Sequence, residues 1–287
     1  MSVALDPPAT SPLAGIHSLE LEITGKCQLA CTHCLSESSP HASHGAMTAA
    51  DWRGTIADAA ALGVRAVQLI GGEPTTHPHW REFAELGLDL GLRVEVYSNL
   101  FHVAPDWWGL FTREGVTLGT SYYSDDPAEH DRITGRKGSY TRTRRHILEA
   151  VRRGVTIRTG VVGVLPGPRG AEARAELESM GVQHIGTDRV RAVGRAALPG
   201  QAPALEEMCG RCTRGRAAVL PNGDLAGCVL SRDFPVGNVR ENRLGDLLRG
   251  QAWAELAARV PTPRAACPPN DSGDCNPANK EACAPAY

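Results

Sequence analysis

No apolar stretch of the 287-residue chain approaches the roughly 18 residues that a membrane-spanning helix requires. The first 15 residues contain neither the basic segment nor the apolar core of a secretory signal. The formal net charge is only −2, so the composition gives no bulk attraction to a polyanion such as nucleic acid. We therefore expect a cytoplasmic protein that binds neither membranes nor nucleic acid.

Cysteine is absent from residues 35–208, although the chain contains nine cysteines. Three lie near the start and six near the end: Cys27, Cys31, Cys34, Cys209, Cys212, Cys228, Cys267, Cys275 and Cys283. An odd number of cysteines without a secretory signal argues against a disulfide framework. The distribution instead predicts two separate metal sites. Thiolate clusters need reducing surroundings, which again favours the cytoplasm.

Segments typical of strands and of helices alternate between residues 17 and 185. The expected strands cover residues 17–24, 65–70, 92–97, 116–123, 155–164 and 182–185. The expected helices cover residues 48–63, 79–90, 105–113, 139–153 and 171–180, and the first begins with a capping box of Thr48 and Asp51. Six successive βα units imply a parallel sheet. We expect an α/β fold, a partial (β/α)6 TIM-like barrel whose active site lies at the C-terminal ends of the strands.

The pattern changes near residue 200, after a Pro- and Ala-rich segment. We expect a flexible tail over 1–16, the barrel core over 17–200 and a small cysteine-rich α+β extension over 201–287. The extension contains a hairpin signal at 221–224 and a helix over 243–259. Its last 25 residues show no periodicity, so we expect a metal cluster to hold them.

The first cysteine group follows the first expected strand with the spacing CxxxCxxC, formed by Cys27, Cys31 and Cys34. Three thiolates can hold three irons of a four-iron cube and leave the fourth iron open. An open iron can bind and activate a ligand. A zinc site is the alternative, because His33 or His44 could supply a fourth ligand nearby.

This motif, at the end of a first strand, resembles that of the radical S-adenosylmethionine (SAM) superfamily. Gly71-Gly72-Glu73-Pro74, after the second strand, is similar to the family's glycine-rich SAM-binding motif. The resemblance assigns residues 17–200 to a radical SAM core. It implies a [4Fe-4S] cluster bound by the three cysteines and SAM, which generates a 5′-deoxyadenosyl radical that abstracts a hydrogen atom from an unactivated carbon. It also implies a flavodoxin or ferredoxin as reductant.

The resemblance suggests further SAM contacts. Ser98 and Asn99 end the third strand, and Ser121 ends the fourth. Arg158 on the fifth strand could meet the SAM carboxylate. His33 stands where the family commonly has an aromatic residue and could pack on the adenine. Each of the strand-end residues could equally be a polar side chain satisfied by the protein itself.

The segment after Ser121 departs from the family, whose relatives often have SLDG there. Here the segment is Ser121-Tyr122-Tyr123-Ser124, so Tyr123 replaces an aspartate. Either tyrosine could face the substrate or pack in the core.

The second cysteine group and the segment 236–253 resemble a SPASM/twitch extension, which binds one or two auxiliary four-iron clusters. The spacing of the last three cysteines departs from the usual pattern, and six thiolates are too few for two fully ligated clusters. We favour one auxiliary [4Fe-4S] cluster held by Cys209, Cys212 and Cys228 with one or more of Cys267, Cys275 and Cys283. Zinc is again the alternative. A leftover thiol could donate a hydrogen atom to a substrate radical.

Two functions fit these features. The first is maturation of a ribosomally synthesised peptide, for example by cross-linking, because SPASM-type extensions in the family accompany peptide substrates. We also expect no extra N-terminal domain that could recognise a leader peptide, which argues against this function. The second is a dehydrogenase or epimerase of a small sugar or aminocyclitol, which the short chain and the single auxiliary cluster favour. A zinc-stabilised binding module would require both motifs to be coincidental.

A run of basic residues accompanies the helix expected at 139–153. It contains Arg132, Arg136, Lys137, Arg142, Arg144, Arg145, Arg152 and Arg153. The run is either a solvated helix face or a docking surface for an acidic leader peptide or a phosphorylated substrate.

Overall fold

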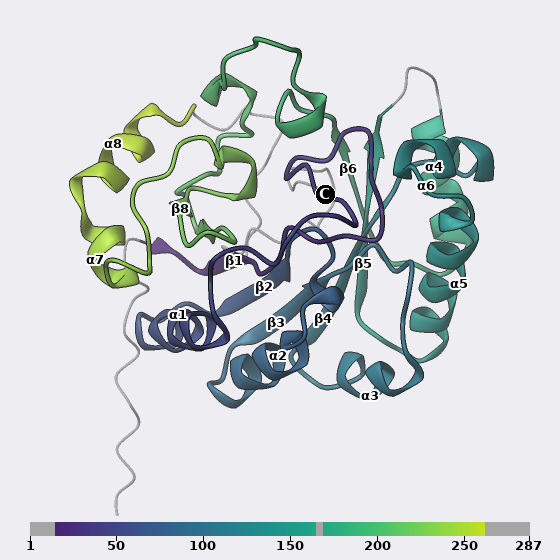
Figure 1. Cartoon of the computed structure of the whole chain (residues 1–287). Coiled ribbons are helices and arrows are strands. Elements are labelled where there is room, and N and C mark those ends of the chain that lie inside the picture. Colours follow the sequence, from purple (N-terminus) through teal and green to yellow (C-terminus); the bar gives the residue numbers. More distant parts are fainter. Residues whose placement is uncertain (1–14, 165–168, 262–287) are drawn as a thin grey trace, which may run out of the picture.

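A computed structural model of the chain describes residues 15–164 and 169–261. Eight strands form one sheet in the order β6-β5-β4-β3-β2-β1-β7-β8 (Figure 1). Every neighbouring pair is parallel except β7 with β8. The strands are β1 (Ser18–Glu22), β2 (Ala66–Ile70), β3 (Arg93–Tyr97), β4 (Val116–Tyr122), β5 (Ile157–Gly163), β6 (His184–Arg189), β7 (Arg216–Val219) and β8 (Leu225–Ala226).

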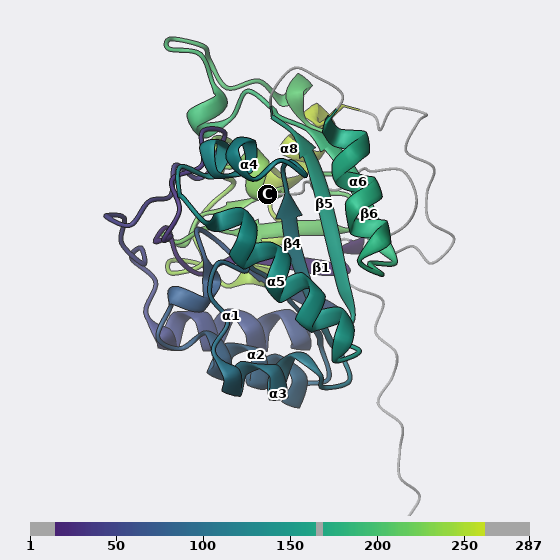
Figure 2. The ribbon, with the colours of Figure 1, turned by 90° about the vertical axis from the view of Figure 1, so that its right-hand side faces the viewer.

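Helices cover the outer face of this sheet, and Figure 2 shows α5 and α6 lying along it beside β4 and β5. They are α1 (Ala49–Ala61), α2 (Trp80–Asp89), α3 (Trp108–Phe111), α4 (Pro127–Thr134), α5 (Ser139–Arg152) and α6 (Arg169–Ser179). In the extension, α7 (Leu244–Arg249) packs beside α1 and precedes α8 (Gln251–Arg259). The expected α/β partial barrel is confirmed. Within the described residues, none of the helices is both long and apolar enough to cross a bilayer.

The alternation of side chains along β1 explains why the outer face of the barrel is apolar and its inner face is charged. Leu19 and Leu21 of this strand belong to the main hydrophobic core together with side chains of α1. Its Glu20 and Glu22 alternate with these leucines, so they point to the opposite face of the sheet. Both carboxylates are buried there, and each pairs with an arginine of the extension: Glu20 with Arg216 at 3.1 Å and Glu22 with Arg232 at 3.0 Å.

Several local predictions are confirmed and others are wrong. Thr48 and Asp51 form the predicted capping box. The prediction of a single helix over 243–259 is wrong. Gly250 has an extended backbone, with ψ of 159°, and separates α7 from α8. Glycine is unfavourable inside a helix because it loses more conformational entropy than other residues when it is ordered. The sequence interpretation missed α4, although Asp126 caps it and Pro127 occupies its first turn, a typical start signal.

The extension continues the sheet of the barrel. Strand β7 pairs with β1 in parallel, with Ser18 opposite Arg216. The predicted hairpin joins β7 to β8 around Gly223, whose φ is +94°. The division of the chain near residue 200 remains a prediction, because the sheet crosses it.

Candidate functional site

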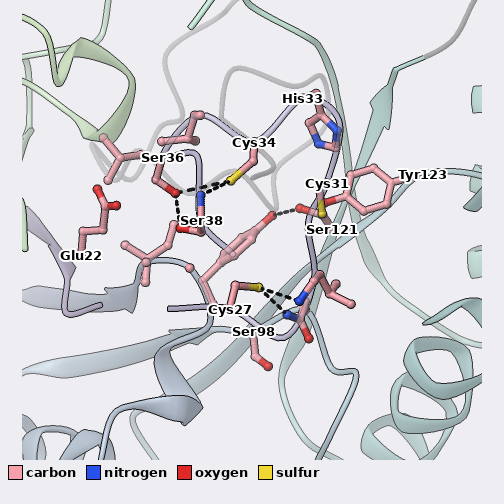
Figure 3. A pocket seen from close by; sticks show the side chains of 18 residues that line it. Glu22, Cys27, Cys31, His33, Cys34, Ser36, Ser38, Ser98, Ser121 and Tyr123 are labelled. Atoms are coloured by element: carbon pink, nitrogen blue, oxygen red, sulfur yellow. Dashed lines mark hydrogen bonds between the residues drawn. The ribbon is translucent and has the colours of Figure 1, made fainter. Parts of the chain in front are cut away.

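A pocket lies at the C-terminal ends of β1–β4, under the loop that joins β1 to α1 (Figure 3). It contains about 690 Å³ of empty space, counting the part open to solvent. Its polar lining comes from the cysteine loop and the strand ends: Glu22, Cys27, Cys31, His33, Cys34, Ser36, Ser38, Tyr97, Ser98, Asn99, Ser121 and Tyr123.

All three thiols of the CxxxCxxC motif line this pocket, and two of them accept N–H donors. The Leu29 backbone N–H and the Asn99 amide each lie 3.4 Å from the Cys27 sulfur. The Ser38 backbone N–H lies 3.4 Å from the Cys34 sulfur. Burial raises the pKa of the Cys27 thiol and raises that of Cys31 to about 12. Buried thiols with N–H donors fit a cationic iron centre, which supplies the positive charge that their thiolates need.

The two histidines considered as zinc ligands have different surroundings, and the buried Nδ1 of His33 has no hydrogen-bond partner among the described residues. The His33 ring packs edge-on against Tyr123 with centroids 4.8 Å apart, and burial lowers its pKa to about 4. His44 Nδ1 lies 2.8 Å from the Thr24 hydroxyl. In the part of the chain that the structure describes, no three His, Cys, Asp or Glu side chains converge on a single-ion position.

The GGEP motif lies directly against the cysteine loop. The Gly72 N–H donates to the Thr24 carbonyl at 2.7 Å, and the Glu73 N–H donates to the Lys26 carbonyl at 2.8 Å. A Cβ atom on Gly71 would overlap the Thr24 backbone, and one on Gly72 would overlap the Lys26 backbone. Both glycines line the pocket, but the close approach that requires them is made to the protein's own chain.

Glu73 is fully buried and turns away from the pocket lining, as does Pro74. The Glu73 carboxylate accepts the Asn99 backbone N–H at 2.8 Å and the Thr75 hydroxyl at 2.7 Å. It therefore joins the ends of β2 and β3. Both oxygens of Glu73 thus accept hydrogen bonds from the protein, and the part of Glu73 in binding SAM stays a prediction.

The remaining predicted cofactor contacts divide into two groups. Ser98, Asn99, Ser121 and His33 line the pocket, where the Ser121 hydroxyl lies 3.0 Å from the Tyr97 hydroxyl. Arg158 does not line it.

Arg158 has its partners within the barrel, and its contact with SAM stays a prediction. Its guanidinium pairs with Glu95 at 2.5 Å and stacks on the Tyr97 ring at 4.9 Å, within the barrel. Its side chain is only 5% exposed, and a buried cation requires such a partner. The Tyr97 ring thus has Arg158 on one side and the pocket on the other.

The two adjacent tyrosines of β4 and its end have different environments. Tyr123 lines the pocket, whereas the Tyr122 hydroxyl donates to Glu176 at 2.6 Å within the core. Sequence reasoning missed Tyr97, Glu22, Ser36 and Ser38 as lining residues. The signal for Tyr97 and Glu22 was available, since each ends a parallel strand.

A second group of thiols lies in the extension. The sulfurs of Cys212 and Cys228 are 2.8 Å apart and buried, and Cys209 is half-buried nearby. The hydrogen bond between the first two lowers the pKa of Cys228 and raises that of Cys212, while the charge of Arg216 favours the thiolate of each. These residues fit three of the four ligands of an auxiliary cluster. Cys267, Cys275 and Cys283 lie outside the described residues.

Comparison with known families gives two matches. Residues 21–177 match the family model described as the radical SAM superfamily. Residues 203–276 match the SPASM model, described as an iron-sulfur cluster-binding domain.

Individual relatives agree with these matches. The chain is 32% identical over 123 residues to the AdoMet-dependent heme synthase of Methanosarcina barkeri, covering 42% of this chain and 35% of that protein. It is 29% identical over 209 residues to the PqqA peptide cyclase of Ruegeria pomeroyi, covering 70% of this chain and 50% of that protein. The chain thus spans about a third to a half of these relatives.

Among solved structures, the chain is similar in fold to Streptococcus suis SuiB bound to S-adenosylmethionine. The TM-score is 0.71 at 15% identity, covering 86% of this chain and 69% of SuiB.

Proposed function

The chain belongs to the radical SAM superfamily, and on that premise we propose that it matures a ribosomally synthesised peptide, for example by installing a cross-link. Membership implies a [4Fe-4S] cluster and SAM, and the SPASM match implies auxiliary clusters. The peptide substrate, a flavodoxin or ferredoxin as reductant and a cytoplasmic location are parts of this proposal.

The observation that carries the proposal is the extent of the match to PqqA peptide cyclase, an enzyme that by its name acts on a peptide. That match covers 70% of the chain, against 42% for the heme synthase. The longer match supports a peptide over a small substrate. The SPASM match supports the same class of enzyme, as the sequence interpretation expected.

The pocket assigns roles to residues of this chain. Cys27, Cys31 and Cys34 would hold the cluster, with Asn99 donating to the Cys27 sulfur. When bound, the cluster and SAM supply a radical that removes a hydrogen atom from an unactivated carbon. Gly71 and Gly72 would border the cofactor with their backbone. The buried side chains of the pocket walls would limit the contact of a reactive species with water.

In the extension, Cys209, Cys212 and Cys228 would hold an auxiliary cluster. Arg216 places positive charge beside these thiols and stays in position through its ion pair with Glu20. Glu20 places negative charge near Cys228 as well, so the ion pair as a whole adds no net charge to the site. An auxiliary cluster there would accept an electron from a substrate radical, as an oxidative cross-link requires.

The test uses short peptide-coding genes next to the gene of this chain. Each encoded peptide is co-expressed anaerobically with the chain and analysed by tandem mass spectrometry. We expect one peptide to lose two hydrogen atoms per cross-link and to resist fragmentation between the joined residues. The Cys27→Ala/Cys31→Ala/Cys34→Ala variant is the control and should leave the peptide unmodified.

The competing function is a dehydrogenase or epimerase of a small sugar or aminocyclitol. If every candidate peptide stays unmodified while the reconstituted chain oxidises or epimerises a small polyol, the peptide proposal is wrong.

A further inference from the structure

Five exposed cationic side chains belong to α4, to α5 and to the turn between these two helices. We call them the α4–α5 basic surface: Arg132, Arg136, Lys137, Arg142 and Arg145. Among the described residues, only Arg132 of these five has a carboxylate partner, Glu129 at 3.9 Å. The surface therefore carries uncompensated positive charge.

The other three arginines of the same basic run have carboxylate partners, two of them sharing one carboxylate. Arg144 pairs with Glu176 at 2.7 Å, and Arg152 and Arg153 pair with Glu149 at 2.6 and 2.5 Å. The expected solvated helix face thus describes the far part of α5. The cations in the first turn of α5 and in the loop before it have no carboxylate partner among the described residues.

The basic surface is joined to the first cysteine loop by backbone hydrogen bonds. The Ala30 N–H donates to the Thr134 carbonyl at 3.1 Å, and the Thr32 N–H donates to the Ile133 carbonyl at 2.9 Å. The Arg136 guanidinium donates to the Gln28 carbonyl at 3.4 Å. The loop that carries Cys27 and Cys31 therefore rests on the C-terminal end of α4.

Phe101 connects the cations to the sulfur of Cys27. Arg136 and Arg142 lie over its ring, with guanidinium carbons 5.1 and 4.7 Å from the centroid. The ring is 7% exposed and packs in a small hydrophobic cluster with Cys27 and Leu29. One side chain thus separates the charged surface from a cluster ligand.

The helix that carries Arg142 is fixed over this ring. The Thr143 hydroxyl donates to the Asn99 carbonyl at 2.9 Å. His146 Nδ1 lies 2.7 Å from the Leu100 carbonyl. Helix α5 is therefore anchored to the same loop that positions Asn99 and Phe101.

We propose that the α4–α5 basic surface is the docking site of the small acidic one-electron carrier protein that reduces the three-cysteine cluster. One electron leaves the reduced carrier, which becomes oxidised by one electron, and enters the cluster beside Cys27. No bond forms or breaks, and no proton moves. The inference rests on family membership and holds whichever substrate the chain modifies.

Three physical arguments favour this partner. Positive charge steers an acidic protein to the surface and speeds its association. Electron-transfer contacts are small, below about 1,200 Å², so one helix turn and a loop suffice. None of the five cations lines the pocket. A substrate bound to this surface would still have to reach the strand ends to react. An electron needs only a short path from the surface to the cluster.

The test compares two reconstituted variants with the same change in charge. Arg136→Gln/Lys137→Gln/Arg142→Gln removes three cations from the surface. Arg65→Gln/Arg93→Gln/Arg113→Gln removes three exposed arginines near the opposite end of the strands. Stopped-flow absorbance follows reduction of the cluster by the hydroquinone of an acidic bacterial flavodoxin, at low and high ionic strength, and by dithionite.

At low ionic strength we expect the surface variant to lose about tenfold or more of its second-order rate constant with flavodoxin. The loss should disappear at high ionic strength, and the control variant should keep at least half of the wild-type rate. Unchanged iron content and an unchanged rate with dithionite show that the cluster site is intact. No peptide is present, so the result is independent of the proposed substrate.

Two outcomes would overturn the inference. One is a flavodoxin rate in the surface variant that equals the rate of wild type or of the control variant. The other is an unchanged flavodoxin rate together with weaker binding of a synthetic acidic peptide, which would assign the surface to a leader peptide.

Discussion

At the scale of single residues, Gly72 illustrates how the two sequence motifs depend on each other. It has no room for a side chain, because a Cβ atom would meet the Lys26 backbone. Gly54, in the middle of α1, has nothing within 4 Å of the same position. Substituting alanine at each of the two glycines therefore compares the same added methyl group at a crowded position and at an open one.

We expect Gly72→Ala to lower the free energy of unfolding by about 1–3 kcal/mol, since the backbone of the cysteine loop cannot yield easily. Gly54→Ala should raise it by about 0.5–1 kcal/mol, because alanine favours a helix interior. Urea unfolding of the metal-free chain measures both. Equal effects of the two substitutions would show that the contact with Lys26 is unimportant.

A second prediction at the scale of residues concerns Arg158. It distinguishes a role in binding SAM from a role in stabilising the barrel. Arg158→Met alone should lower the free energy of unfolding by about 1–3 kcal/mol, because it leaves the half-buried Glu95 carboxylate with the Gln68 amide but without its cation. The double variant Arg158→Met/Glu95→Met should recover much of this loss. Denaturation of the single and double variants checks the order.

The same double variant separates the two roles of Arg158. Its affinity for SAM, measured by equilibrium dialysis on the reconstituted chain, should stay close to the wild-type value. A large loss of affinity that persists in the folded double variant would restore the contact with the SAM carboxylate.

Residue types and spacing at the site were predictable from the sequence, but directions of side chains were not. Cys27, Cys31 and Cys34 lie in the pocket because a short motif at a strand end leaves little freedom. Glu73 has a partner in Asn99, just after β3, and Arg158 has one in Glu95 of β3, and contacts between distant segments do not appear in the local pattern. Neither position could therefore be settled from a single sequence.

At the scale of elements, the two cysteine groups belong to different parts of one sheet. Cys27, Cys31 and Cys34 follow β1, whereas Cys212 precedes β7 and Cys228 follows β8. Because β7 lies beside β1, the two sites are held at a fixed separation by strand pairing. Each should load with iron independently, since they share no ligand.

We expect about eight irons per chain after anaerobic reconstitution, falling to about four in Cys27→Ala/Cys31→Ala/Cys34→Ala. The matched variant Cys209→Ala/Cys212→Ala/Cys228→Ala should also retain about four. Iron and sulfide analysis measures both. About twelve irons in the wild type would mean that every thiol is a ligand and that none is left to donate hydrogen.

The presence of the helices and strands was easier to predict than the points at which they begin and end. Alternating patterns located the six strands of the barrel, since each buries a recognisable run of side chains. The break at Gly250 and the start of α4 at Asp126 depend on single residues, and the sequence interpretation weighted periodicity above them. Pairing of β7 with β1 lies beyond any local signal, because it joins residues almost 200 positions apart.

At the scale of the whole molecule, the interior of the barrel is a charged lining between the two cysteine sites. Glu20 of β1 pairs with Arg216 of β7, and Glu95 of β3 pairs with Arg158 of β5 across this face. Asp188 with Arg191 adds a third pair at 2.6 Å. A lining of this kind was not predicted, since alternation in β1 alone suggests solvent on the polar face, whereas the extension covers it.

The parallel pairing of β1 with β7 also has a consequence for the order in which the protein folds. During synthesis, β1 emerges early and can pair with β2, but its other edge stays open until β7 follows. An open strand edge exposes unpaired N–H and C=O groups and is prone to pair with other chains. The strand that leads into the first cysteine motif is therefore complete only when the last third of the chain arrives, so the nascent barrel depends on its extension for protection from aggregation.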